Sequence, residues 1–403
     1  MGVIYVVVEA MKLGYSQEDS TWSNLGQGQP EVGELEGAPP RFPEIPVLPG
    51  DYAYGPVEGL RELRAMVADH YNRLYRRGLP SQYSAENVVI AAGGRTTLSR
   101  AFAALNRIRL GYFTPDYTAY EDLLTANERI TPVLISLFPE QAFSIEPKKL
   151  QQVIRHEKLG ALLISNPCNP TGRVIRGSEL MEWVELARGE PVSLLVDEYY
   201  SHYVWSASSS PEEKSVSSAR YIEDVDRDPV VIFDGLTKCF RYPGWRLGWA
   251  VGPKEMVRNI TAAGSFADGG PPRPIQRAAL EILSPRRADQ ETDAVRANFK
   301  LKRNRTVEEL SELGISFPLE PEGTFYAFGD ISRLPPPLNS GSSFFREALK
   351  YKVLTVPGEF FDVNPHKLRT GKSPLEHFVR FSYGPPMATL AQGLDNLQRM
   401  IQG

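Results

Sequence analysis

Residues 161–200 read ALLISNPCNPTGRVIRGSELMEWVELARGEPVSLLVDEYY, and this stretch decides the fold. Two short runs in it, Ala161–Ser165 and Val192–Val196, are almost entirely apolar and do not alternate with polar residues. That pattern is typical of strands that helices cover on both faces. The residues between the two runs suffice for one helix. The stretch therefore predicts two neighbouring strands joined through a helix.

Further runs of the same kind lie along the chain, with helical stretches between them: Val88–Ala91, Leu110–Phe113, Pro132–Ser136, Val230–Phe233 and Leu247–Val251. Alternating strands and helices predict an α/β fold with a doubly wound sheet. In such sheets a ligand binds at the carboxyl ends of the strands. Residues that directly follow the predicted strands are therefore the candidates for chemistry.

The two ends of the chain have a different composition. Gly26–Gly55 is crowded with glycine and proline, which predicts an extended arm without a helix. From Leu60, apolar residues recur at helical spacing until Gly78 and Pro80 stop the pattern. A long charged stretch, Ile275–Leu313, predicts a helix with a break at Ser284-Pro285, and a mixture of helices and strands follows it.

The composition indicates a folded globular protein with a small-molecule ligand. The chain has 403 residues, 42% of them hydrophobic and 23% charged, and a formal net charge of −4. This charge favours neither nucleic acid nor a membrane surface as a partner. Cys168 and Cys239 provide no disulfide framework and no metal-ligand spacing, and the apolar run Val3–Val8 is too short to span a bilayer. We therefore expect a cytoplasmic protein without a metal site.

Several short motifs follow the predicted strand ends in order: Gly93-Gly94-Arg95-Thr96, Asn166-Pro167-Cys168-Asn169-Pro170-Thr171-Gly172, Asp197-Glu198-Tyr199-Tyr200, Thr237-Lys238 and Pro243-Gly244-Trp245-Arg246-Leu247-Gly248-Trp249. Together they resemble the fold-type I pyridoxal-phosphate enzymes, and within them the class I/II aminotransferase family. The resemblance extends from Gly26 to Arg380. It implies pyridoxal 5′-phosphate as cofactor and a large domain with a seven-stranded, mostly parallel sheet sandwiched by helices, plus a smaller α+β domain. The boundaries we predict are 1–48 for an N-terminal arm that is part of the small domain, 49–284 for the large domain and 285–403 for the small domain.

Lys238 matches the lysine that forms a Schiff base with the cofactor in the family. A lysine must lose its proton before it attacks a carbonyl, so it needs desolvation or a neighbouring cation. Arg246 stands eight residues further on, and the residues between are mostly apolar. A solvated loop lysine is the alternative, which the flanking Phe240, Tyr242 and Trp245 disfavour.

Asp197 directly follows the apolar run Val192–Val196. A buried carboxylate is costly unless it meets a positive partner, and the resemblance implies that the partner is the protonated ring nitrogen of the cofactor. The alternative is a helix N-cap. By the same resemblance, Tyr200 and Asn169 bond the phenolic oxygen of the cofactor, and Tyr117 stacks on its ring unless it is only a core aromatic residue.

A phosphate needs backbone N–H groups at a helix start and positive charge. Gly94 opens a predicted helix, Arg246 supplies a guanidinium and Thr237 a hydroxyl. Arg95 stands where the family has small or amide residues, so it either binds the phosphate or points outward. The resemblance also implies that Tyr54 reaches the phosphate of the partner subunit, which predicts a homodimer with shared sites.

Substrate binding is expected at Arg380, which lies between apolar residues in Phe378-Val379-Arg380-Phe381. Its planar fork fits an α-carboxylate, and the resemblance adds Asn169 and Gly28 to the same pocket. Relatives that take dicarboxylates bring a second arginine from the partner subunit to the distal carboxylate of the substrate, and the corresponding region of this chain, around Ala262–Phe266, has none. A buried carboxylate without a countercharge is costly, which predicts a neutral, apolar or aromatic amino donor unless Arg95, Arg41 or Arg273 enters the site.

The resemblance therefore implies an aminotransferase that moves an amino group between an amino acid and a 2-oxo acid. One alternative is a β-eliminating lyase or another non-transaminating enzyme of the same fold, because the same cofactor-holding residues support several outcomes. Another is a non-catalytic ligand-binding homologue, against which the presence of Lys238, Asp197 and Arg380 argues.

Overall fold

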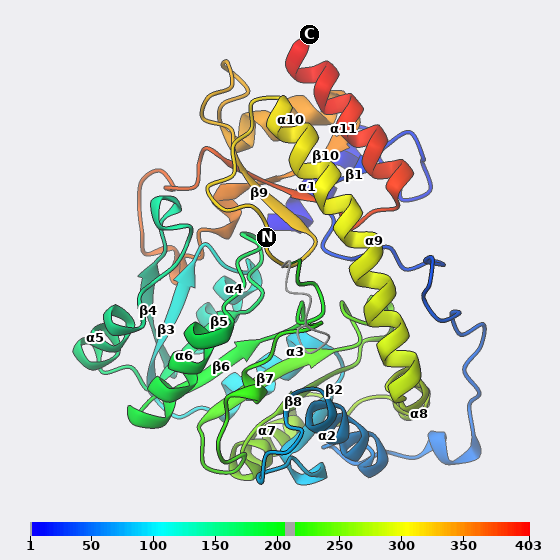
Figure 1. Cartoon of the computed structure of the whole chain (residues 1–403), viewed down its shortest axis with the longest axis vertical. Helices are drawn as coiled ribbons and strands as arrows, with labels where there is room; N and C mark the ends of the chain where they lie inside the picture. Colours follow the sequence, from blue (N-terminus) through cyan, green and yellow to red (C-terminus); the bar gives the residue numbers. More distant parts are fainter. Residues whose placement is uncertain (1, 206–213) are drawn as a thin grey trace.

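The computed structural model describes residues 2–205 and 214–403, and its centre is a seven-stranded sheet with the order β2-β8-β7-β6-β5-β3-β4 (Figure 1). The strands are β2 (Val88–Ala91), β3 (Ile108–Thr114), β4 (Ile130–Ser136), β5 (Ala161–Ser165), β6 (Ser193–Asp197), β7 (Val230–Gly235) and β8 (Gly248–Val251). Strand β8 runs antiparallel to both of its neighbours, and the other pairs are parallel. All seven predicted strands are confirmed, with ends that differ by no more than a few residues.

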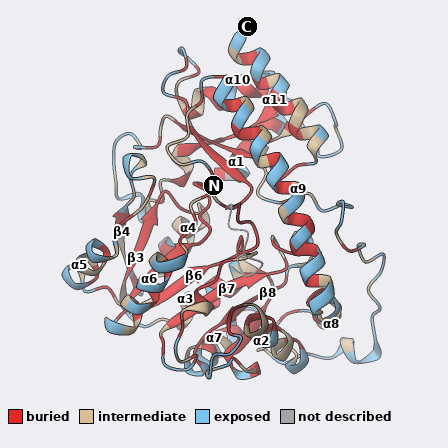
Figure 2. Cartoon of the chain, viewed as in Figure 1, coloured by how far each residue is buried: buried red, intermediate tan, exposed pale blue. Residues whose placement is uncertain are grey.

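Burial explains why these strands could be predicted. Every residue of β2, β5, β7 and β8 is buried, so the strands appear red in Figure 2. The helices around the sheet are α2 (Arg61–Tyr75), α3 (Gly94–Ala104), α4 (Ala119–Thr125), α5 (Pro147–Glu157), α6 (Gly177–Gly189), α7 (Lys254–Ala267) and α8 (Arg273–Ile282). Helices α3 and α7 pack on each other and on β2, and α6 packs on α5 and β6. Strands enclosed in this way need apolar side chains on both faces.

The C-terminal part forms a three-stranded antiparallel sheet with the order β11-β12-β9. Its elements are α9 (Pro285–Glu312), β9 (Tyr326–Asp330), α10 (Gly341–Lys350), β10 (Val353–Leu354), β11 (Val356–Pro357), β12 (Phe378–Ser382) and α11 (Met387–Gln402). Helices α8 and α9 meet at Ser284-Pro285, as predicted. None of the helices in the described part of the chain is both long and apolar enough to cross a membrane.

The N-terminus joins this C-terminal sheet region. Strand β1 (Ser23–Asn24) pairs in parallel with β10, and helix α1 (Gly2–Lys12) packs on β10 and β11. Helix α1 was not predicted, because its β-branched residues have low helix propensity; it is stabilised by packing, with Val6 and Ala10 fully buried. The three predicted domain boundaries stay a prediction.

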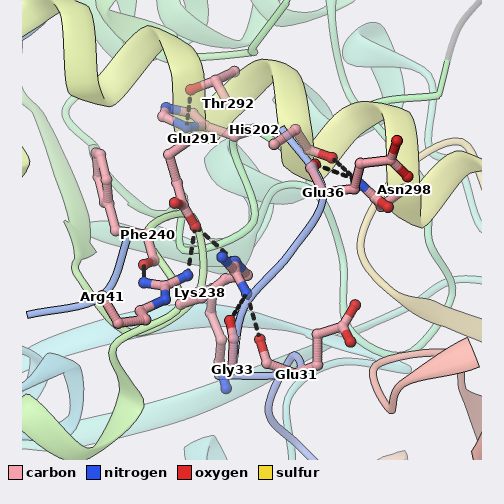
Figure 3. Close-up of polar contacts among 12 residues, drawn as sticks. Glu31, Gly33, Glu36, Arg41, His202, Lys238, Phe240, Glu291, Thr292 and Asn298 are labelled. Atoms are coloured by element: carbon pink, nitrogen blue, oxygen red, sulfur yellow. Dashed lines mark hydrogen bonds and ion pairs between the residues drawn. The ribbon is translucent and has the colours of Figure 1, made fainter. Parts of the chain in front are cut away.

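Within Gly26–Gly55 the predicted extended arm is confirmed, apart from one 3₁₀ turn at Pro49–Tyr52. A buried ion-pair network ties this arm to α9 (Figure 3). One oxygen of Glu291 accepts from Arg241 Nε at 2.6 Å and from Arg41 at 3.0 Å. Arg241 also donates to the carbonyl oxygens of Glu31 and Gly33. One buried carboxylate therefore neutralises two guanidinium groups and fixes the course of the arm.

We predict that Glu291→Ala lowers the free energy of unfolding by about 3–5 kcal/mol, because it leaves buried guanidinium charge without a partner. The matched control is Glu320→Ala, which removes a carboxylate that pairs with Arg303 at the surface and costs at most about 1 kcal/mol. Chemical denaturation of both variants and the wild type measures the difference. Equal losses in the two variants would contradict this assignment.

Candidate active site

The predicted site residues meet at the carboxyl edge of β5, β6 and β7. Ser165 at the end of β5 lies opposite Asp197 of β6, and Asp197 lies opposite Phe233 of β7. The loops that follow these strand ends carry Asn169, Tyr199 and Lys238. Parallel pairing alone therefore brings side chains from three distant parts of the sequence to one place.

Lys238 has a strongly lowered pKa of about 7. Burial is the main cause, and the positive charges of Arg380, Arg95 and Arg246 add to it, whereas Asp197 acts in the opposite direction. The amine Nζ donates a hydrogen bond to the carbonyl oxygen of Gly28 in the N-terminal arm. A large fraction of the amine is therefore neutral near pH 7, as a nucleophilic lysine requires.

Asp197 is buried and has no cation in hydrogen-bond contact among the described residues. Its Oδ2 accepts from the hydroxyl of Tyr120 at 2.8 Å, and its Oδ1 accepts from the backbone N–H of Tyr199 at 3.3 Å. Burial raises the pKa of Asp197 to about 6, although these two hydrogen bonds and the charge of Lys238 act to lower it. A cationic group placed beside Asp197 would relieve this cost, which suits a protonated ring nitrogen.

Arg380 on β12 is fully buried and held by two partners. One terminal nitrogen donates to Asn169 Oδ1 at 2.9 Å, and the other donates to the carbonyl oxygen of Gly26 at 2.8 Å. Its Nε has no hydrogen-bond partner, and each terminal nitrogen keeps one further N–H. The guanidinium is therefore oriented by the protein and retains donors for an anionic ligand.

Tyrosines that received no role from the sequence lie beside these groups. The hydroxyls of Tyr326 and Tyr200 are 3.0 Å apart, and the guanidinium of Arg380 stacks 4.0 Å above the Tyr326 ring. Only the pairing of β9 with β12 places Tyr326 beside Arg380. Tyr120, which bonds Asp197, stands three residues after Tyr117, and this helical spacing is the one sequence signal that points to it.

The groups predicted to hold a phosphate form a cradle with unused donors. Gly93, with φ of +95°, precedes α3, and a side chain at Gly93 would collide with the Arg246 guanidinium. Gly94 begins the helix, so its neighbouring N–H groups point out of the helix N-terminus. The buried hydroxyl of Thr237 has no partner. Free donors, a helix N-terminus and Arg246 together fit a phosphate group.

Arg95 lies in the site and is bonded to Tyr117. Its Nε donates to the Tyr117 hydroxyl at 3.2 Å, and its charge helps to lower the pKa of Lys238. Tyr117 is half-buried and meets the ring of Tyr120 edge-on at 5.4 Å between centroids. Tyr54, in contrast, is 99% exposed and contributes nothing to the site of its own chain, so its action on a partner subunit stays a prediction.

Comparisons with known proteins identify the family of the chain. The profile of the family described as "Aminotransferase class I and II" matches residues 20–397. A probable aspartate/prephenate aminotransferase of Aquifex aeolicus is 26% identical over 360 residues, which cover 88% of this chain and 84% of the relative. An aspartate/prephenate aminotransferase of Thermus thermophilus is also 26% identical, over 87% of this chain and 84% of the relative.

Solved structures show the same fold. An aspartate aminotransferase of Thermus thermophilus with maleate superposes with a TM-score of 0.81 at 23% identity, covering 99% of this chain and 96% of that one. An aromatic aminotransferase of Pyrococcus horikoshii superposes with a TM-score of 0.77 at 21% identity, covering 98% of both chains. These similarities establish the fold-type I architecture that the sequence predicted.

In the cofactor-free protein we expect Lys238 to react with trace acetic anhydride with a midpoint near pH 7, because the neutral amine is the reactive form. Mass spectrometry of the Lys238 peptide across a pH series measures this midpoint. Arg380→Gln serves as the matched variant: removing the strongest cationic influence should move the midpoint upward. A wild-type midpoint close to the ordinary lysine value of about 10.4 would refute the assignment.

Proposed function

The chain belongs to the class I and II aminotransferases, and on that premise we propose that Lys238 is the residue that carries the cofactor pyridoxal 5′-phosphate. The protein is a pyridoxal-phosphate-dependent aminotransferase with amino acid and 2-oxo acid substrates. Membership of this family favours transamination over the lyase and the non-catalytic alternatives. The observation that carries the assignment of Lys238 is its partly neutral amine, which faces both the unneutralised Asp197 and the buried Arg380.

The residues around Lys238 match the parts of the cofactor. Asp197 would hold the ring nitrogen protonated, and Asn169 and Tyr200 would donate to the phenolic oxygen. Tyr117 would cover the ring. The phosphate would bind to Gly94, Thr237 and Arg246. The unpartnered hydroxyl of Thr237 and the N-terminus of α3 provide hydrogen-bond donors for it. When bound, the cofactor supplies an electron sink that stabilises negative charge at the substrate Cα.

Lys238 has a second task once its amine is free. With a pKa near 7, Nζ accepts a proton from the substrate Cα at neutral pH and can also return it. The carbonyl oxygen of Gly28 accepts a hydrogen bond from the same amine and so fixes the amine against the N-terminal arm. The arm therefore positions the group that moves the proton.

Arg380 would bind the substrate α-carboxylate. The contacts to Asn169 and to the Gly26 carbonyl occupy one N–H of each terminal nitrogen and leave the others, together with Nε, for the ligand. Because the guanidinium is already oriented and buried, little side-chain entropy is lost when the carboxylate binds.

The preference for an amino donor depends on whether a second cation, besides Arg380, reaches the substrate. The prediction of a neutral donor assumed that no further arginine enters the site. For two of the three candidates this assumption fits the structure, because Arg41 pairs with Glu291 and Arg273 pairs with Asp51. Arg95, however, donates to the Tyr117 hydroxyl and lies near enough to Lys238 for its charge to lower the pKa of that amine. We propose that the site accepts dicarboxylic donors with the distal carboxylate on Arg95, and aromatic donors between Tyr117 and Tyr326. The names of the relatives, aspartate/prephenate aminotransferases, fit such a pair of substrate classes.

We also propose a homodimer with shared sites. A phosphate-binding role of Tyr54 needs a second chain, and in the single chain both Tyr54 and Tyr52 are almost fully exposed. Large exposed aromatic residues on an arm are typical of an interface.

Lys238→Ala should lose turnover by several orders of magnitude and still bind the cofactor without a covalent bond, because Asp197 and the phosphate cradle remain. Reduction of the wild-type holoenzyme with borohydride, followed by peptide mapping, should find the label on Lys238. Lys254→Ala, which removes a surface lysine paired with Asp226, is the control and should behave as wild type. A label on another lysine would overturn the assignment.

Arg95→Gln should lower kcat/KM for aspartate about tenfold or more and leave kcat/KM for phenylalanine within about threefold, because only aspartate has a distal carboxylate. Steady-state kinetics with aspartate, alanine, leucine and phenylalanine measure this selectivity. Arg273→Gln is the matched control and should change none of the four values. If Arg95→Gln has no selective effect and wild type prefers the apolar donors, the neutral-donor prediction holds instead.

A further inference from the structure

Asp116 is a buried carboxyl group to which no role has yet been assigned. It lies in the loop between β3 and α4, directly before Tyr117, and only 1% of it is exposed. Its hydrogen-bond partners in the described part of the chain include no basic side chain. Burying a carboxyl group without a cation costs free energy, and leucine would fill a similar space without that cost. The residue type therefore indicates a need for the hydrogen bonds that Asp116 makes.

Three donors from two loops converge on Asp116. Its Oδ1 accepts from the backbone N–H of Tyr117 at 2.7 Å and from the hydroxyl of Ser165. Its Oδ2 accepts from the backbone N–H of Ser165 at 3.3 Å. Ser165 is the last residue of β5 and is itself buried. Asp116 therefore ties the loop after β3, which carries Tyr117, to the end of β5.

Ser165 connects Asp116 to the substrate side of the site. The hydroxyl oxygen of Ser165 accepts from the backbone N–H of Asn169 at 3.3 Å. The side-chain oxygen of Asn169 in turn accepts from Arg380 at 2.9 Å. A continuous series of hydrogen bonds therefore runs from Asp116 to the guanidinium that would bind the substrate α-carboxylate.

A second contact connects the same loop to Arg380. The backbone N–H of Asp116 donates to the carbonyl oxygen of Phe361 at 3.2 Å, and Thr114 Oγ1 donates to the same oxygen at 3.3 Å. The ring centroid of Phe361 lies 5.0 Å from the guanidinium carbon of Arg380. Both the side chain and the backbone of Asp116 are thus connected to residues that contact this guanidinium.

Asp116 acts through hydrogen bonds rather than through charge. Burial raises the pKa of Asp116 to about 8, and the negative charge of Asp197 adds to this, although the hydrogen bonds from Ser165 and Tyr117 act to lower it. At neutral pH most of the carboxyl group is therefore protonated and uncharged. Asparagine has nearly the same shape and keeps Oδ1 as an acceptor, so it should be able to replace Asp116.

We propose that Asp116 is a positioning residue for the binding of the substrate α-carboxylate. Its side chain fixes Ser165 and thereby the backbone of Asn169. Asn169 then keeps the guanidinium of Arg380 in one orientation, so that little freedom is lost when the carboxylate binds. The inference rests on the proposed function, in which Arg380 binds this carboxylate.

The test measures how tightly the holoenzyme binds unreactive carboxylates. The ligands are 3-phenylpropanoate and succinate, which resemble the two proposed donor classes but lack an amino group, and absorbance titration gives their dissociation constants. Asp116→Leu should weaken binding of the tighter ligand about tenfold, because the Ser165 hydroxyl loses its acceptor and the backbone of Asn169 is no longer fixed. Asp116→Asn should stay within about threefold of the wild type.

Three further variants separate positioning from a general loss of stability. Ser165→Ala interrupts the same series of hydrogen bonds and should reproduce the effect of Asp116→Leu. Ser201→Ala is the matched control, because its buried hydroxyl donates to another buried carboxyl group, that of Asp234, at 3.3 Å; it should leave the constants unchanged. In an Asn169→Ala background, Asp116→Leu should have no additional effect, because the side chain that it positions is absent.

The other outcomes distinguish this inference from the proposed function. Wild-type binding by Asp116→Leu, while Arg380→Gln weakens binding, would overturn the inference. Equal losses in Asp116→Leu and Asp116→Asn, or losses that add to that of Asn169→Ala, would also overturn it. If the wild type binds neither ligand, or Arg380→Gln does not weaken binding, the proposed function itself is contradicted. If thermal unfolding shows that Asp116→Leu does not fold, Ser165→Ala decides in its place.

Discussion

Parallel pairing of β5, β6 and β7 is the constraint on which the rest of the site depends. Parallel neighbours end at the same edge of a sheet, so the residues after each strand meet although they are far apart in the sequence. This geometry brings Asn169, Asp197 and Lys238 to the same edge of the sheet. The strands must be apolar on both faces to stay inside the helical layers, which leaves the polar groups to the loops at their ends.

The electrostatic character of the site follows from three guanidinium groups that act on Lys238, of which Arg380 is buried and Arg95 and Arg246 are exposed. Arg380, Arg95 and Arg246 act together with burial on Lys238 and lower its pKa, while Asp197 alone opposes them. Such an excess suits a cofactor with a phosphate and a substrate with a carboxylate. Burial and these three guanidinium groups keep the lysine amine partly neutral, as the proposed nucleophile requires.

The N-terminal arm links the stability of the fold to the geometry of the site. Carbonyl oxygens of Gly26 and Gly28 bind Arg380 and Lys238, and Glu291 fixes the same arm through Arg41 and through Arg241. Arg241 lies three residues after Lys238, with its backbone in the left-handed region at φ of +57°. The buried ion pair therefore holds the lysine loop and the arm in one arrangement (Figure 3).

The sequence by itself determined the features that depend on neighbouring residues. Continuous apolar runs identified the seven strands, glycine and proline identified the arm, and Ser284-Pro285 identified the helix break. The motifs led to the prediction of Lys238, Asp197 and Arg380 as site residues. Tertiary structure decided the rest, because Tyr120 meets Asp197 and Tyr326 meets Tyr200 only through contacts between distant elements. Arg95 is the clearest case: its residue type left two orientations open, and in the folded chain it donates to the Tyr117 hydroxyl, 22 positions away, while its charge acts on Lys238. Local pattern fixes which residues form an element, whereas packing between elements fixes which side chains share a site.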